Sequence, residues 1–201
     1  MTDRPSGNPS SKTTDLRQLR TRRALRDGLL SLLKTQPFDE ITIRDITSES
    51  LVGYNTFFRH YSSKEELVEE IVAEEFLQLL ERSQPALIRA ETHQSALALC
   101  EYVNDNRDLW SALLCGGAAP VLKRMLIGYA LRNGDNTPTL DWLPADLGAT
   151  VGIGAALDIL TWWLSKHSEC TIEQVSNLMD RLVITPMLAQ ESTWKQKQAK
   201  P

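Results

Sequence analysis

The chain has few residues of the kinds on which disulfides, metal sites and catalysis depend. Its three cysteines, Cys100, Cys115 and Cys170, are an odd number and have no spacing typical of zinc sites. The three histidines form no spaced metal set with them or with carboxylates, and no nucleophile elbow or phosphate-binding loop occurs. An enzyme is the main rival class, but we expect no metal, no cofactor, no catalysis and a reduced, cytoplasmic setting.

Strand patterns and targeting segments are also missing. No run alternates β-branched and polar residues between hairpin turns, so the chain is predicted to be all-α. No apolar run follows a basic start, as it would in a signal peptide. The longest apolar stretch, "LGATVGIGAALDILTWWL", contains Asp158 and is preceded by Asp146. We interpret it as a buried helix rather than a membrane span.

The charge is unevenly distributed along the 201 residues. A net charge of −4 argues against a general nucleic-acid coat or a basic membrane-surface protein. Residues 1–64 hold 11 Lys and Arg against 7 Asp and Glu, which is +4, and the remainder holds 11 against 19, which is −8. The positive charge is therefore concentrated at the front of the chain.

Turn and capping residues, together with hydrophobic periodicity, divide the chain into three parts. Residues 1–13 are polar and are predicted to form a disordered arm. Residues 14–62 contain helical patterns at about 15–35, 42–49 and 53–60. Residues 63–201 open with the capping box of Ser63 and Glu66, which starts a helix to about Arg82. Further helices are expected at about 86–104, 106–115, 119–132, 144–167 and 171–190.

The two short helices, joined by a turn of three to four residues, have the dimensions of a helix-turn-helix. Corners of this kind also occur in helical proteins that bind nothing, so spacing alone leaves a simple packed unit open. The chemistry favours DNA, because the second helix offers donors and stacking groups and Lys64 lies in the first turn of the next helix. A cation is unfavourable there unless an anion such as phosphate is its partner.

The run from Thr42 to Leu67 resembles the DNA-binding segment of TetR-type transcriptional regulators, close to T-V-x-x-I-A-x-x-A-G-V-S-x-x-T-F-Y-x-H-F-x-x-K-x-x-L. The residues that carry the resemblance are Thr42, Ile43, Ile46, Val52, Thr56, Phe57, Phe58, His60, Tyr61, Lys64 and Leu67. It extends to about residues 20–80, and the remaining helices fit by layout only. The resemblance implies an N-terminal three-helix helix-turn-helix domain and a C-terminal helical domain for ligand binding and dimerisation.

Three positions depart from the pattern. Leu51 replaces the turn glycine, Gly53 replaces the serine that caps the recognition helix, and Phe58 replaces a tyrosine whose hydroxyl reaches a phosphate. A leucine at positive φ costs on the order of 1 kcal/mol or more, so either the turn has another geometry or it is strained. These departures keep open a TetR-like protein with weakened DNA binding that acts through a protein partner.

The resemblance also implies site residues on the helix-turn-helix. Tyr54 and Asn55 are the candidates for reading bases, since an amide pairs with an adenine edge and a ring meets a thymine methyl group. The candidates for positioning phosphates are Arg44, Thr56, His60 and Lys64. The candidate DNA-binding set also includes Gly53 and Arg59. The arm with Arg4 and Lys12 is a further candidate for a minor groove.

The second half is expected to hold an effector pocket and a dimer interface. The candidate pocket lining, for which ordinary core is the alternative, is Trp110, Leu113, Leu114, Met125, Tyr129 and Trp142. The candidate dimer interface combines a face of small residues, Gly148, Gly152, Ala155 and Ala156, with two tryptophan anchors, Trp162 and Trp163. For the tryptophans, filling of the core is the alternative.

The sequence therefore predicts a homodimeric, cytoplasmic regulator with no membrane association. We expect it to be a repressor that binds a palindromic double-stranded operator and leaves it when a small hydrophobic effector binds. The effector, the operator and the regulated genes have no signature in the sequence.

Overall fold

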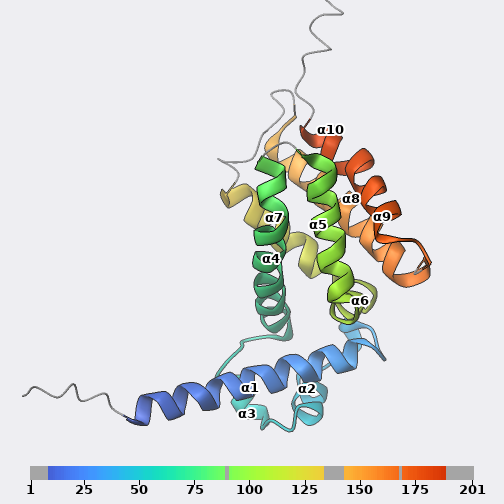
Figure 1. Cartoon of the computed structure of the whole chain (residues 1–201). Coiled ribbons are helices and arrows are strands. Elements are labelled where there is room, and N and C mark those ends of the chain that lie inside the picture. Colours follow the sequence, from blue (N-terminus) through green and yellow to red (C-terminus); the bar gives the residue numbers. More distant parts are fainter. Residues whose placement is uncertain (1–8, 89–90, 134–142, 168, 189–201) are drawn as a thin grey trace, which may run out of the picture. The chain divides into compact units, whose positions relative to one another are not determined.

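In a computed structural model, residues 9–88, 91–133, 143–167 and 169–188 are described. Within these ranges the secondary structure is helical and contains no strand, which confirms the all-α class (Figure 1). The chain separates into two compact units, Met1–Leu67 and Val68–Pro201.

The first unit contains α1 (Pro9–Leu33), the 3₁₀ turn η1 (Phe38–Glu40), α2 (Ile43–Glu49), α3 (Tyr54–Phe57) and the start of α4 (Lys64–Ile88). Residues 9–13, expected in a disordered arm, are thus helical. Proline is tolerated at the first helical position because the N–H that it lacks would have no partner there. Residues 1–8, the rest of that arm, lie outside the described part of the chain.

The core of the first unit is built around the contact of α1 with α2. Leu25, Leu29 and Ile46 are completely buried there, and Phe57 joins them from α3. Gly28 lets the two helices approach closely, because a Cβ at this position would lie 3.0 Å from the Cβ of Ser50. A larger residue would therefore force α1 and α2 apart.

Side chains cap the starts of α2 and α4. The Thr42 hydroxyl accepts from the Asp45 N–H at 3.2 Å, and the Asp45 carboxylate accepts from the Thr42 N–H at 2.8 Å, so the two residues form a full capping box. Ser63 accepts from the Glu66 N–H, but the Glu66 carboxylate reaches one residue further, to the N–H and hydroxyl of Ser62. These hydrogen bonds lower the pKa of Asp45 and of Glu66 below their ordinary values.

The turn between α2 and α3 keeps the left-handed geometry even though its key residue is leucine. Leu51 has φ 53°. Its N–H donates to Ser48 O at 3.3 Å, and the Val52 N–H donates to Thr47 O at 2.9 Å, which is a Schellman motif at the end of α2. Of the two possibilities that the sequence leaves open, the strained turn is the one observed.

The second unit contains the rest of α4 and the helices that follow it. They are α5 (Thr92–Asp105), α6 (Arg107–Cys115), α7 (Ala119–Asn133), α8 (Ala145–Lys166), α9 (Ile172–Met179), the π-helical turn η3 (Asp180–Ile184) and α10 (Thr185–Leu188). The boundary near Pro85 was predicted wrongly, because α4 continues through Pro85 to Ile88. Proline frees the carbonyl of Glu81, and that residue is exposed, so water can satisfy it.

Helix α8 forms an antiparallel hairpin with α9 and η3. It packs against α6 and α7 on one side and against α9 and η3 on another (Figure 1). Its length and mean hydropathy of 1.4 would suit a membrane span, yet only 28 % of its most apolar window is buried. The helix predicted to be buried therefore presents an uncovered apolar face.

We expect Leu51→Gly to stabilise the first unit by about 0.5 to 1 kcal/mol, because glycine adopts the left-handed conformation without steric strain. The greater conformational entropy of glycine in the unfolded chain offsets only part of this gain. The Leu51 side chain is 94 % exposed, so its removal loses little packing. Leu51→Ala is the matched control, since it removes the side chain but keeps the backbone cost. Thermal and urea unfolding measure the difference, and equal stability of the two variants would contradict the strain.

Candidate functional site

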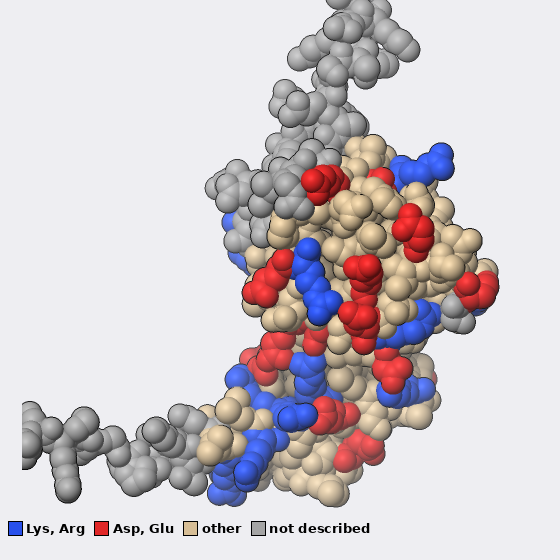
Figure 2. Space-filling view, in the orientation of Figure 1, with Lys and Arg blue, Asp and Glu red and all other residues tan. Residues whose placement is uncertain are grey.

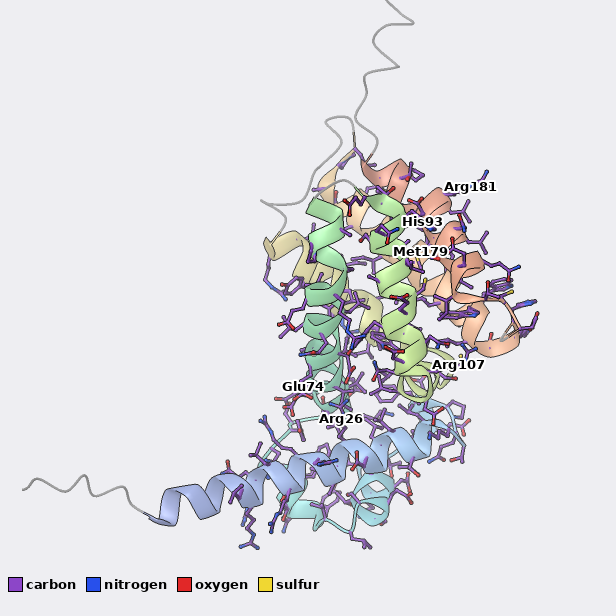
Figure 3. All side chains as sticks on the ribbon, in the orientation of Figure 1. Arg26, Glu74, His93, Arg107, Met179 and Arg181 are labelled. Carbon is purple, nitrogen blue, oxygen red and sulfur yellow. The ribbon has the colours of Figure 1, made fainter. Side chains whose placement is uncertain are left out.

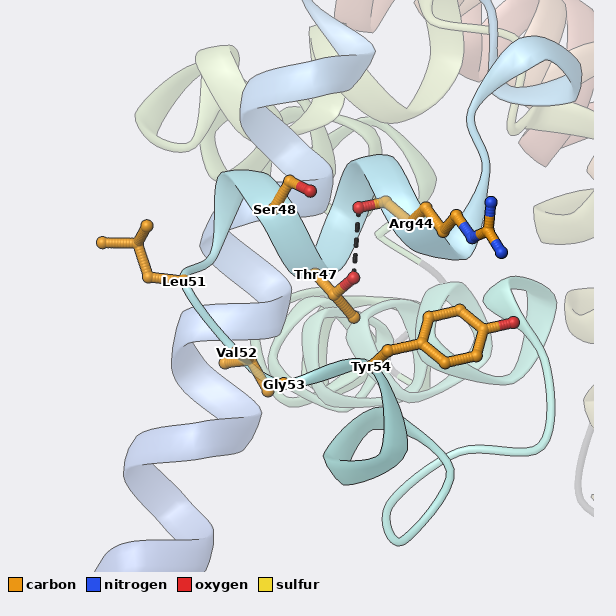
Figure 4. A pocket seen from close by; sticks show the side chains of 7 residues that line it. All are labelled: Arg44, Thr47, Ser48, Leu51, Val52, Gly53 and Tyr54. Atoms are coloured by element: carbon orange, nitrogen blue, oxygen red, sulfur yellow. Dashed lines mark hydrogen bonds between the residues drawn. The ribbon is translucent and has the colours of Figure 1, made fainter.

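The outer face of the helix-turn-helix has an open hollow of about 710 Å³ between α2 and α3 (Figure 4). Its lining consists of Arg44, Thr47, Ser48, Leu51, Val52, Gly53 and Tyr54. Three of the predicted site residues, Arg44, Gly53 and Tyr54, are thus brought together. The sequence interpretation did not include Thr47 and Ser48 in the site, although their spacing of three and four residues from Arg44 would have placed them on one face of α2.

Arg44 and Tyr54 form the polar end of this hollow. The Arg44 guanidinium carbon lies 5.9 Å from the centre of the Tyr54 ring, and the Tyr54 ring meets Phe58 edge to face at 5.3 Å. The Thr47 hydroxyl donates to Arg44 O at 3.1 Å within α2 (Figure 4). A cation and a phenol ring are therefore held side by side at the surface.

The other predicted DNA-binding residues lie along and just beyond α3. Asn55 and Arg59 are exposed, whereas Thr56 and His60 are half-buried. Gly53 precedes α3 with extended backbone and provides no side-chain cap. Accordingly, Asn55, Arg59 and the Arg44–Tyr54 pair are the groups of this face that are accessible to a large polyanion.

Basic residues also gather along α1 (Figure 2). Arg17, Arg20 and Arg23 are exposed, and Arg22 places its guanidinium carbon 5.9 Å from the centre of the buried Tyr61 ring. This positive surface belongs to the same unit as the hollow.

Lys64 does not present its ammonium group to a partner outside the chain. Nζ donates to Phe38 O at 2.7 Å, Ile41 O at 2.8 Å and Asp39 O at 3.2 Å, and it lies 4.5 Å from the centre of the Phe38 ring. An ammonium group has three N–H donors, and all three are used. The predicted phosphate contact of Lys64 is therefore corrected: the cation in the first turn of α4 is compensated by backbone carbonyls.

The candidate effector residues lie mostly in the core of the second unit. Trp110, Leu113 and Leu114 are buried, Met125 and Tyr129 are half-buried, and Trp142 lies outside the described residues. The Trp110 Nε1–H is buried and has no acceptor among the residues described. A buried donor of this kind costs free energy until an acceptor reaches it.

The candidate dimer residues require a correction at Trp163. This side chain is only 1 % exposed: its Nε1–H donates to Cys170 O at 3.1 Å, and the Arg107 guanidinium carbon lies 5.0 Å from the centre of its ring. It is therefore core, whereas Trp162 is 39 % exposed.

The small-residue face is also partly covered from within the chain. A Cβ on Gly152 would lie 3.7 Å from Met187 Cγ, and one on Gly148 would lie 3.1 Å from Leu143 Cδ2. Ala155 and Ala156 are half-buried. The exposed apolar side chains of α8 and of the α9–η3 segment are a different set: Leu147, Val151, Trp162, Leu178 and Leu182.

Within the described ranges, no three His, Cys, Asp or Glu side chains come together in a way that would hold a metal ion.

Comparison with known proteins gives a family match at the front of the chain. Residues 25–71 match the family model of bacterial regulatory proteins, tetR family. One curated relative, an uncharacterized HTH-type transcriptional regulator YxbF of Bacillus subtilis (strain 168), is 32 % identical over 100 residues. The matched stretch is 47 % of this chain and only 26 % of that relative.

Solved structures extend the likeness to most of the chain. A TetR transcriptional regulator from Streptococcus agalactiae 2603V has a TM-score of 0.62 at 21 % identity, covering 87 % of this chain and 99 % of that one. A TetR-family transcriptional regulator from Syntrophomonas wolfei has a TM-score of 0.61 at 16 % identity, covering 88 % and 99 %. At these identities the likeness shows a shared fold, including the helical second unit.

We expect Lys64→Ala to destabilise the first unit by about 2 kcal/mol, because three carbonyl oxygens lose a charged donor. Lys64→Met keeps the aliphatic stem against Phe38 and isolates the loss of the hydrogen bonds. Arg59→Ala, which removes an exposed cation from the same unit, is the control and should leave the unfolding free energy unchanged. Urea denaturation measures all three, and a Lys64→Ala chain as stable as wild type would show that the ammonium group is free for another partner.

Proposed function

We propose that this chain is a transcriptional regulator of the tetR family of bacterial regulatory proteins, whose model matches residues 25–71, and that it acts as a DNA-binding repressor. It binds a palindromic operator as a cytoplasmic homodimer and leaves the operator when a small hydrophobic effector binds the second unit.

The observation that carries the proposal is the exposed face around the hollow between α2 and α3. Arg44, Tyr54, Asn55 and Arg59 present cations, a ring and an amide to solvent from two short helices. Tyr54 and Asn55 are the groups suited to base edges, and Arg44 and Arg59 to phosphates. The strained turn at Leu51 retains the helix-turn-helix geometry despite the loss of the glycine.

The uncovered face of the second unit supports a homodimer. Leu147, Val151 and Trp162 on α8 and Leu178 and Leu182 on α9 and η3 are exposed apolar side chains. An apolar face of this extent on a helix of mean hydropathy 1.4 is typical of a protein interface. A two-fold dimer would also present two helix-turn-helix units to the two halves of a palindrome.

The buried Trp110 Nε1–H supports an effector that is mainly apolar but carries one hydrogen-bond acceptor. Phe76 and Tyr129 meet edge to face at 4.9 Å and offer further aromatic surface in the same unit. To weaken operator binding a hundredfold, such a ligand needs about 2.7 kcal/mol of preference for the form that does not bind DNA.

We expect salt-sensitive binding to palindromic DNA from the region flanking the chain's own gene. Arg59→Ala should weaken binding to all sequences alike and lower the salt slope by about 1, whereas Tyr54→Ala should change the base preference at a cost of about 1 to 3 kcal/mol. Arg132→Ala, on α7, is the control. Fluorescence anisotropy with labelled duplexes at several salt concentrations gives these quantities.

Equal affinity for random and promoter DNA at physiological salt would sink the proposal. In that case the exposed apolar side chains of Leu51 and Phe58 on the same face would favour the alternative, a TetR-like protein that acts through a protein partner.

We also expect intrinsic tryptophan fluorescence to respond to hydrophobic, acceptor-bearing compounds and not to polyanions. Trp110→Phe should lower the affinity of these compounds about tenfold, since it removes the buried donor. Trp162→Phe is the control outside the core. Strongly charged binders, or compounds that bind wild type and Trp110→Phe equally, would refute this account of the effector.

A further inference from the structure

The uncovered apolar face of the α8–α9–η3 hairpin carries two charged side chains. Asp158 is exposed in α8, in the same stripe as Leu147, Val151 and Trp162, with spacings of four, seven and four residues that repeat on one face of a helix. Arg181 is exposed in η3, between Leu178 and Leu182, and lies on its outer side in Figure 3.

These two charges lie at the same level of the hairpin. Gly152 of α8 lies beside Met187, because a Cβ added to Gly152 would be 3.7 Å from Met187 Cγ. Because the helices are antiparallel, six residues forward from 152 reach 158, and six residues back from 187 reach 181. Asp158 and Arg181 are therefore level, on neighbouring helices of one face.

Neither charge has an ion-pair partner within the part of the chain that the structure describes. A carboxylate in the middle of an apolar stripe is well solvated while the face is open. Once a partner covers the stripe, the carboxylate loses water, and burying it without a cation is unfavourable.

We propose that Asp158 of one subunit and Arg181 of the other form a reciprocal ion pair at the centre of the homodimer. This inference rests on the proposed dimer. In a two-fold interface the same surface serves both subunits, so a contact between 158 and 181 occurs twice. Because the two residues are level, a two-fold axis parallel to the hairpin brings each opposite the other. The pair sets the register of an interface whose other contacts are apolar and unspecific.

The test is a charge swap in the full chain. The variants are Asp158→Arg, Arg181→Asp and the double variant, and the dimer dissociation constant is measured by sedimentation equilibrium at low and high salt. Each single variant places like charges opposite one another and should raise the dissociation constant at least tenfold. The double variant restores both pairs and should return to within about threefold of wild type.

The control is Glu81→Arg, which reverses an exposed charge on α4 and should leave the dimer unchanged. Circular dichroism verifies folding, and Asp158→Asn, which removes the charge without reversing it, replaces any single variant that fails to fold. Single variants with wild-type dissociation constants, or a double variant as weak as the singles, would overturn the pair alone. A wild-type chain that is monomeric at micromolar concentration would overturn the pair and the proposed dimer together.

Discussion

The ammonium group of Lys64 holds the connection between α1 and α2 to the start of α4. Three backbone carbonyls of residues 38–41 point toward one spot, and such a convergence of oxygen dipoles is unfavourable without a cation at its centre. With the ammonium in place, Phe38 and Ile41 remain in the core and α2 can begin at Thr42 with its capping box. The geometry of the helix-turn-helix therefore depends on a residue outside its two helices.

Local features were predictable because local chemistry determines them. The Thr42–Asp45 and Thr171–Gln174 capping boxes are read directly from the spacing of a hydroxyl and a side-chain acceptor, and both are present. The sequence limits the turn at Leu51 to two outcomes, another turn geometry or a strained leucine at positive φ. The backbone conformation of the turn, with φ 53° at Leu51, distinguishes them. Helix positions and the all-α class followed from such signals and from periodicity.

Features that depend on packing across the chain were not predictable. Lys64 is 23 to 26 residues away from the carbonyls that it contacts, so its place in the sequence suggested an external anion instead. In α8 nearly every position is apolar, so periodicity does not distinguish the inner face from the outer. A shift of one residue turns a helix by about 100°, which is the difference between the buried Trp163 and the exposed Trp162.

The π-helical turn η3 has a consequence for how the chain tolerates changes in length. A π turn holds one residue more than an α-helical turn, and here the hydroxyl of Thr185 donates to the Asp180 carboxylate across the widened segment at 2.7 Å. Relatives that lack one residue within 180–184 would continue as plain α-helix. Their later residues, corresponding to Thr185 onward, would keep their orientation toward α8. An alignment without a gap in this segment would therefore compare side chains from different faces.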